Sequence, residues 1–176
     1  MALASAVPAV VSACDEGRAV PLFVCVDMVA TQAVVEAAEE TGRPAIVGLY
    51  GGLLERPRSD HFVRWARAVA EESAAPLSLM LDHGRSVEAC RRALSLGFTD
   101  IMYDGSKLAV EENLENTRRV AEAAQAAGAG VEAELGIVGA GSKYSTFGAK
   151  GKGFTDPETA GRFAADSGCD ILAVAV

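Results

Sequence analysis

A regular alternation of short apolar runs with longer amphipathic segments constrains the fold of this chain more than any other feature. Six runs are short and apolar on successive positions, as is typical of strands that are covered on both faces. The alternation predicts consecutive βα units on a parallel sheet. The predicted strands span residues 20–28, 44–50, 76–83, 98–105, 130–138 and 169–176.

Helices are expected between these strands, and several have recognisable first residues. Thr31 is the expected N-cap of one helix and Ser86 that of another, while Thr155 or Asp156 opens the last. Other segments are Ala-rich and amphipathic, and the residues before the first strand form a short leading helix in this interpretation. The predicted helices span 4–16, 32–41, 60–73, 87–96, 111–127 and 157–167.

Length and charge exclude several classes of protein. A chain of 176 residues can form one domain with a sizeable core, so we expect a single domain over 1–176. The net charge of −8 and the lack of a Lys/Arg cluster argue against a nucleic-acid partner. No apolar run approaches the roughly 18 residues of a membrane helix, and no signal peptide is evident. Four cysteines without CxxC spacing indicate a reducing, cytoplasmic protein.

Two architectures fit such a string of elements, an open doubly wound sheet and a TIM (β/α)8 barrel. The phosphate-binding pattern GxGxxG is missing after the first strand, where the sequence reads "DMVATQ". Barrels assemble their sites at the carboxyl ends of several strands, and the acidic residues of this chain gather there, which favours a barrel. Six strands form only part of an eight-stranded barrel. The residues at these ends are Asp27, Asp82, His83, Asp104, Glu132 and Glu134.

One imidazole and several carboxylates at one rim are suited to a divalent metal such as zinc. Because side chains alternate along a strand, Asp82 and His83 are expected to point to opposite faces, whereas Glu132 and Glu134 share a face. Two like charges on one face repel each other unless a cation or a basic group lies between them. In this interpretation Asp104 belongs to the same cluster of charges as Glu132 and Glu134. The alternative for His83 is a solvated residue of the rim without a ligand.

Other polar segments have simpler interpretations. His61 stands at the start of a predicted helix, where a surface role is expected. The run "EENLENTRR" over 111–119 is typical of a solvated helix face. The segment 139–154 has the Gly, Ser and Lys content of a loop, either a flexible connection or a lid over the rim. Its three lysines match no phosphate-cradling motif.

The motifs "LDHG", "MYDGS" and "EAELG", in this order and spacing, resemble those of the class II, metal-dependent fructose- and tagatose-bisphosphate aldolases. The resemblance covers nearly the whole chain. It implies a zinc-dependent (β/α)8 lyase that cleaves a ketose bisphosphate into dihydroxyacetone phosphate and an aldehyde. By the same resemblance His83 is a ligand of the catalytic zinc and Asp82 the acid/base for the aldehyde oxygen. Asp104 and Glu134 match a second or alternative metal position, with Glu132 as an accessory group.

The sequence also departs from the family pattern. Two of the three zinc histidines of the pattern have no counterpart here, and neither do its phosphate-binding loops. No Asp or Glu occurs between Glu134 and Asp156, where the family brings a glutamate for the proton of dihydroxyacetone phosphate. The first two strands end in "FVCVDM" and "VGLYGG", where the family has FNVNN and a Ser-containing turn.

Three functions therefore remain open from sequence. The leading one is the aldolase, with fructose 1,6-bisphosphate or tagatose 1,6-bisphosphate as the phosphorylated sugar substrate. The second is a non-catalytic subunit, truncated or completed by a partner. The third is an aldolase-like lyase acting on a different sugar. A homo-oligomer, or a partner chain that completes the barrel, is expected.

Overall fold

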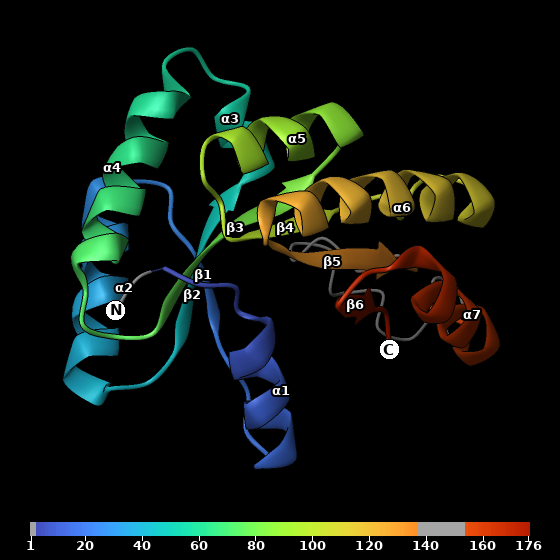
Figure 1. Cartoon of the computed structure of the whole chain (residues 1–176), viewed down its shortest axis with the longest axis horizontal. Coiled ribbons are helices and arrows are strands. Elements are labelled where there is room, and N and C mark those ends of the chain that lie inside the picture. Colours follow the sequence, from blue (N-terminus) through green and yellow to red (C-terminus); the bar gives the residue numbers. More distant parts are fainter. Residues whose placement is uncertain (1–2, 137–153) are drawn as a thin grey trace, which may run out of the picture.

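The computed structural model describes residues 3–136 and 154–176, in which six parallel strands form one curled sheet (Figure 1). The strand order follows the chain from β1 to β6, and each strand pairs in parallel with the next. An order that never reverses excludes the doubly wound alternative and confirms the partial (β/α)8 barrel. The strands are β1 (Leu22–Val24), β2 (Ala45–Tyr50), β3 (Leu77–Gly84), β4 (Asp100–Tyr103), β5 (Gly130–Leu135) and β6 (Ile171–Val174).

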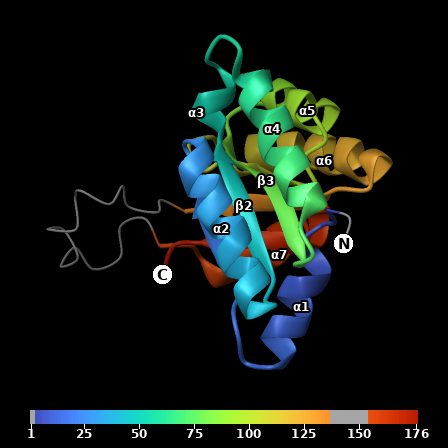
Figure 2. The ribbon, with the colours of Figure 1, turned by 90° about the vertical axis from the view of Figure 1, so that its left-hand side faces the viewer.

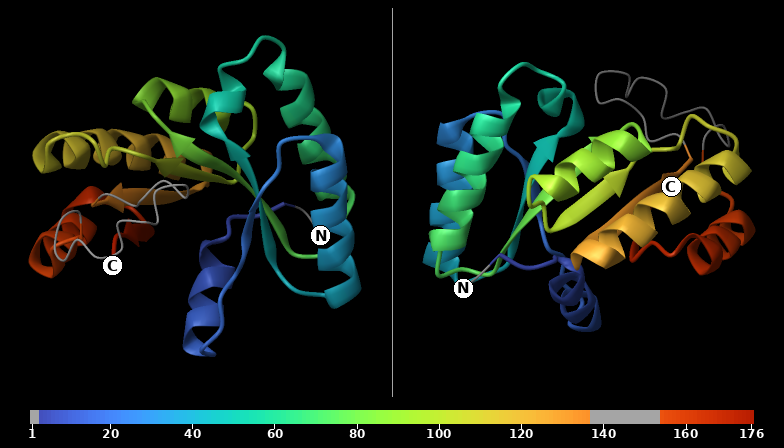
Figure 3. Two further views of the ribbon diagram at one scale, coloured as in Figure 1. Left: turned by 180° about the vertical axis from the view of Figure 1, so that it is seen from behind. Right: turned by 45° about the horizontal axis from the view of Figure 1, so that its top comes forward.

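Helices cover the outer, convex face of this half-barrel. Figure 2 shows α2 and α4 side by side over β2 and β3, and the second panel of Figure 3 shows α5, α6 and α7 following one another along the remaining strands. This is the layer arrangement that consecutive right-handed βα units produce. The helices are α1 (Val7–Asp15), α2 (Met28–Thr41), α3 (Gly51–Leu54), α4 (Ser59–Glu72), α5 (Val87–Ser95), α6 (Val110–Ala127) and α7 (Pro157–Ser167).

Alternation along the strands separates an outer core from an inner face. Leu79 and Leu81 of β3 are fully buried in the main cluster beneath the helices, with Tyr103 of β4. Met80 and Met102 lie on the inner face instead, in a smaller apolar cluster. The inner face therefore carries this apolar cluster near the amino ends of the strands, together with the buried Asp100, and the candidate site residues stand at the carboxyl ends.

The start of α1 closes the amino end of the inner face, apart from the outer helices (Figures 1 and 3). Ala6 is buried in the inner cluster, and its backbone N–H donates to the carboxylate of Asp100 at 3.0 and 3.1 Å. The hydroxyl groups of Ser5 and Thr99 donate to the same carboxylate at 2.7 and 2.8 Å. Burial raises the pKa of Asp100, whereas these hydrogen bonds favour its charged form.

The beginning of the chain differs from the sequence prediction. The predicted strand 20–28 is reduced to the three residues of β1, and α2 begins at Met28. Thr31 is not the N-cap: it lies inside α2, and its hydroxyl donates to the carbonyl oxygen of Asp27 at 2.8 Å. Asp27 is the cap, because its backbone is extended and its side chain accepts from Ala30 N at 2.8 Å.

The remaining elements agree with the predictions apart from their ends and the short α3. The predicted caps Ser86 and Asp156 accept from backbone N–H groups three residues later. The predicted loop or lid over 139–154 lies outside the described residues except for its last residue, and so do residues 137 and 138 of the predicted strand 130–138. Among the helices described, none is long and apolar enough to cross a membrane.

Candidate metal centre

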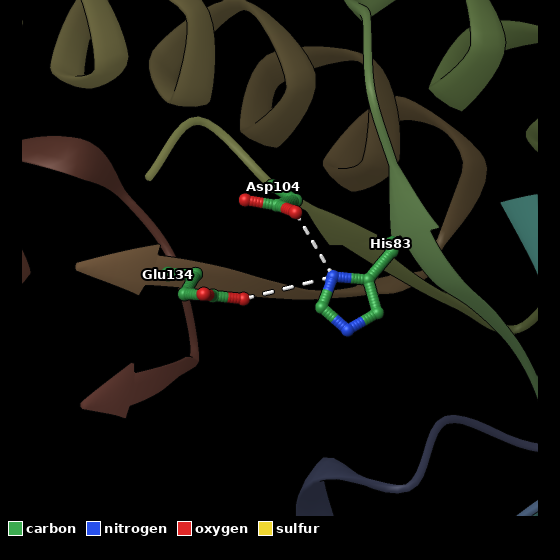
Figure 4. A group of neighbouring side chains, drawn as sticks. All are labelled: His83, Asp104 and Glu134. Atoms are coloured by element: carbon green, nitrogen blue, oxygen red, sulfur yellow. Dashed lines mark hydrogen bonds and ion pairs between the residues drawn. The ribbon is translucent and has the colours of Figure 1, made fainter. Parts of the chain in front are cut away.

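Three side chains from successive strands meet at the carboxyl rim of the sheet. His83 lies near the end of β3, Asp104 directly follows β4, and Glu134 lies in β5. His83 Nδ1 is 3.0 Å from Asp104 Oδ2 and 3.7 Å from Glu134 Oε2. Figure 4 shows one nitrogen of the imidazole, Nδ1, facing both carboxylates. The candidate ligand atoms of the three residues all lie within 4.8 Å of one another.

A local irregularity of β3 positions the imidazole. Between Leu81 and Gly84, three residue steps of β3 face two steps of β4, so one residue is extra. His83 has a φ of 55°, in the left-handed region that non-glycine residues rarely adopt. The strict alternation expected for Asp82 and His83 is therefore broken here. A Cβ atom at position 84 would meet Met102 O at 2.9 Å, which explains the glycine after the histidine.

The loop after β4 holds Asp104 as a carboxylate. Ser106 donates to Asp104 Oδ1 through its hydroxyl at 2.6 Å and its backbone N–H at 3.2 Å. Burial is the largest single influence and raises the pKa of Asp104, but the hydrogen bonds from Ser106 and His83 together outweigh it. The net pKa of Asp104 is lowered. This carboxylate is thus preorganised in its charged, metal-binding form.

Glu132 and Glu134 of β5 have raised pKa values, in contrast to Asp104. Glu134 is 4% exposed, and burial followed by the charge of Asp104 raises its pKa. Burial raises the pKa of Glu132 to about 7, and the charges of Asp82 and Glu134 act in the same direction. Carboxylates that repel one another in a buried place are stabilised by a cation among them.

Asp82 stands beside this group on β3. It pairs in register with Tyr50 of β2. Burial raises the pKa of Asp82; the charge of His83 opposes this increase, and the charge of Asp104 adds to it. The ring of Tyr50 meets the imidazole of His83 edge to face, with centroids 6.3 Å apart. The structure thus places four of the predicted acids and His83 at one rim.

Two other candidates from the sequence lie elsewhere. Asp27 caps α2, as described above, and is not part of the cluster. His61 is exposed in the first turn of α4, as expected, where the neighbouring Asp60 forms an ion pair with Arg92 at 2.6 Å.

Some residues that support the centre were not singled out from sequence. Asn113 is 1% exposed, although it lies in the run interpreted as a solvated face, and its amide donates to Glu134 O at 2.9 Å. The spacing of Asn113 from Thr117, Val120 and Ala124 on the buried side of α6 was the available signal. Ser106 acts locally on Asp104, two residues earlier, and lies within the motif "MYDGS". Tyr50 and Arg85 act through tertiary contacts that leave no local pattern.

The donor set fits a zinc ion. One imidazole nitrogen with carboxylate oxygens is a ligand combination that zinc takes, and catalytic sites use three protein ligands and keep one position open. Glu134 is buried among like charges, so a cation would offset the cost of ionising it. Fold and site together define a protein of the (β/α)-barrel class with a candidate metal site at the carboxyl rim.

Comparisons with known proteins narrow this class. The family model for class-II fructose-bisphosphate aldolase matches residues 6–176. The chain is 40% identical over 161 residues to fructose-bisphosphate aldolase of Thermus caldophilus, covering 92% of this chain and 52% of that protein. It is 32% identical over 179 residues to fructose-bisphosphate aldolase of Staphylococcus aureus (strain Mu50), covering 100% and 62%.

A solved structure gives the same result. The crystal structure of the YdjI aldolase from Escherichia coli K12 superposes with a TM-score of 0.87 at 30% identity, over 99% of this chain and 62% of that one. The chain belongs to the class II fructose-bisphosphate aldolase family. It spans between half and two thirds of the length of the relatives named here.

Proposed function

We propose that this chain carries the metal-binding and proton-transfer part of a zinc-dependent ketose-bisphosphate aldolase. Its reaction is the reversible cleavage of fructose 1,6-bisphosphate or tagatose 1,6-bisphosphate into dihydroxyacetone phosphate and glyceraldehyde 3-phosphate. The observation that carries the proposal is the approach of His83, Asp104 and Glu134 at the carboxyl rim, with Asp82 beside them. Membership of the aldolase family supports it.

The chemistry assigns a separate task to each residue. A zinc ion, if held by these residues, would supply a Lewis acid for the ketone oxygen and its developing negative charge. His83 supplies a nitrogen ligand, while Asp104 and Glu134 offer oxygen ligands for the same ion or for a second metal position. Asp82 holds a proton more readily than an exposed aspartate, because burial raises its pKa. It is therefore suited to exchange that proton with the aldehyde oxygen as the carbon–carbon bond breaks or forms.

The half-barrel also needs further strands. β1 and β6 are the edges of the sheet, and Phe23 and Val24 of β1 are 47% and 49% exposed. Unpaired edges with apolar side chains favour pairing with another segment. We propose that additional βα units, from the same protein or a partner chain, complete the barrel in the cytoplasm and supply the remaining zinc and phosphate ligands. A homo-oligomer is the expected assembly.

Zinc binding and turnover test this function together. The 176-residue chain is titrated with zinc in competition with a chromophoric chelator, and retro-aldol cleavage of each bisphosphate is followed by a coupled assay. His83→Ala is expected to weaken zinc binding at least about 100-fold, because it removes a direct ligand, and to abolish turnover. His61→Ala, which removes the only other histidine, is the matched control and should behave as wild type.

The outcomes separate the three functions considered. Stoichiometric zinc with turnover that depends on His83 supports the aldolase. Zinc binding without cleavage of either bisphosphate, in folded material, favours the non-catalytic subunit unless another sugar is cleaved. A folded chain that binds no zinc contradicts the proposed function.

A further inference from the structure

A cationic side chain is fixed at the same rim as the acidic centre. Arg85 follows β3 directly, two residues after His83, and its guanidinium lies over the ring of Tyr50 at 5.7 Å from the centroid. Its Nη2 donates to the Tyr50 hydroxyl at 2.5 Å. These two contacts with Tyr50 restrict the side chain of Arg85 more than that of an exposed arginine surrounded only by water.

The charge of Arg85 has no carboxylate partner in the described part of the chain. The arginines that form ion pairs there are Arg18, Arg67, Arg92, Arg118 and Arg162. The guanidinium of Arg85 donates one hydrogen bond to a phenol, and its other N–H groups have no partner within residues 3–136 and 154–176. A planar fork of free donors matches the oxygen atoms of a phosphate.

The neighbouring charges explain why such a cation is useful there. Asp82, Asp104, Glu132 and Glu134 stand at this rim, and the whole chain carries a net charge of −8. These carboxylates attract a metal ion but repel a phosphorylated substrate. A fixed positive charge at the edge of the cluster offsets that repulsion for a ligand whose anionic end lies over Tyr50.

We infer that Arg85, seated on Tyr50, binds the phosphate of the aldehyde half of the substrate. The choice of end rests on the proposed function, in which Asp82 serves the aldehyde oxygen. Tyr50 is the register partner of Asp82 across the β2–β3 pair, so the substrate atoms next to Tyr50 belong to the aldehyde half. Arg85 therefore selects a phosphorylated aldehyde over a neutral one, and it is a binding residue with no part in proton transfer.

Direct binding tests this assignment without relying on turnover. Calorimetry on the 176-residue chain compares D-glyceraldehyde 3-phosphate with unphosphorylated D-glyceraldehyde, with and without added zinc. Wild type is expected to prefer the phosphorylated aldehyde at least about tenfold, and Arg85→Gln should remove most of that preference, because a hydrogen-bonded charge is lost. Tyr50→Phe keeps Arg85 but removes its acceptor, and about a threefold loss is expected.

Arg91→Gln is the matched control, since Arg91 is an exposed arginine on α5 and its replacement changes the net charge equally. The assignment is supported if Arg91→Gln keeps the preference for the phosphorylated aldehyde and Arg85→Gln loses it. Equal binding of the two aldehydes by wild type, or an unchanged preference in Arg85→Gln, overturns it. Zinc binding is measured on the same samples. If the chain binds no zinc but its preference for the phosphorylated aldehyde depends on Arg85, only the proposed function is contradicted. If the chain binds zinc and Arg85→Gln leaves the preference unchanged, only this inference is contradicted.

Discussion

Gly51, the first residue of α3, lies so close to His83 that a Cβ atom at position 51 would be 2.4 Å from the His83 carbonyl oxygen. Real Cβ atoms do not approach an oxygen so closely, so any larger residue must push the end of β3 away. His83 has little freedom to respond, because its backbone is already in the left-handed region. The glycine after β2 thus helps to set the position of a side chain on β3.

Gly51→Ala is therefore expected to displace His83. We predict a loss of about 1–3 kcal/mol in the free energy of unfolding, as for other overpacked sites. Zinc affinity should fall about tenfold or more, because a ligand loses its support. Urea unfolding and zinc titration measure the two effects. Gly161→Ala is the control, since a Cβ atom there meets nothing within 4 Å in α7, and it should be neutral or slightly stabilising.

Asn113→Ala tests the support beneath Glu134. The buried amide of Asn113 satisfies Glu134 O, and the variant leaves that carbonyl group without its partner. The expected loss is about 1–3 kcal/mol in the free energy of unfolding. Gln125→Ala, at an exposed position of the same helix, should change stability little. Equal stabilities of the two variants in urea unfolding would show that the amide contributes nothing measurable.

Asp100→Ala is expected to release α1 from the sheet. The carboxylate receives hydrogen bonds from Ala6 N and from two hydroxyl groups, and all three are lost together. We predict a loss of about 2 kcal/mol in the free energy of unfolding. Hydrogen exchange should accelerate in α1 more than in α6, and Asp166→Ala, an exposed carboxylate on α7, should leave both unchanged. Unaltered protection of α1 in Asp100→Ala contradicts the assigned role.

Glu132 makes the metal-free chain more stable in mild acid. Burial raises its pKa from the ordinary 4.5 to about 7, so the folded state holds the proton more tightly than the unfolded state. The ionisation of Glu132 therefore lowers the free energy of unfolding. This loss is absent below about pH 4.5, grows as the pH rises, and reaches its full size above about pH 7. With chelator present, Glu132→Gln should stabilise the chain by up to about 3 kcal/mol at pH 8 and by little near pH 4.5.

The control for this pH dependence is Glu122→Gln, an exposed carboxylate on α6. Urea unfolding at both pH values should show no such difference for the control. A stability gain in Glu132→Gln that is equal at pH 4.5 and pH 8 would refute the pKa explanation, because a packing effect does not titrate.

The sequence predicted the parallel sheet and most of the candidate site for a physical reason. Apolar runs followed by charged residues mark the carboxyl ends of buried strands, and parallel pairing brings those ends together, which places Asp104 and Glu134 near His83. The extra residue of β3 could not be predicted, because it depends on pairing with β4. Asp27 misled the prediction, since an acid after a strand and an acid that caps a helix look alike locally.

The contact of Arg85 with Tyr50 was equally out of reach. It joins the end of β3 to the end of β2 through a stacked guanidinium, and neither position has a spacing that distinguishes it from an ordinary surface residue. Asn113 differs, because its helical spacing was visible and only its polarity led to the interpretation as a solvated position.

Because β3 carries one residue more than β4 between Leu81 and Gly84, the site depends on residue count as well as on residue type. Deleting one residue there would restore regular pairing and turn the side chains that follow it to the other face of the sheet. Substitutions leave that count intact. During evolution or design, the chemistry of this segment can therefore be altered one side chain at a time, whereas a single-codon insertion or deletion would dismantle the centre at once.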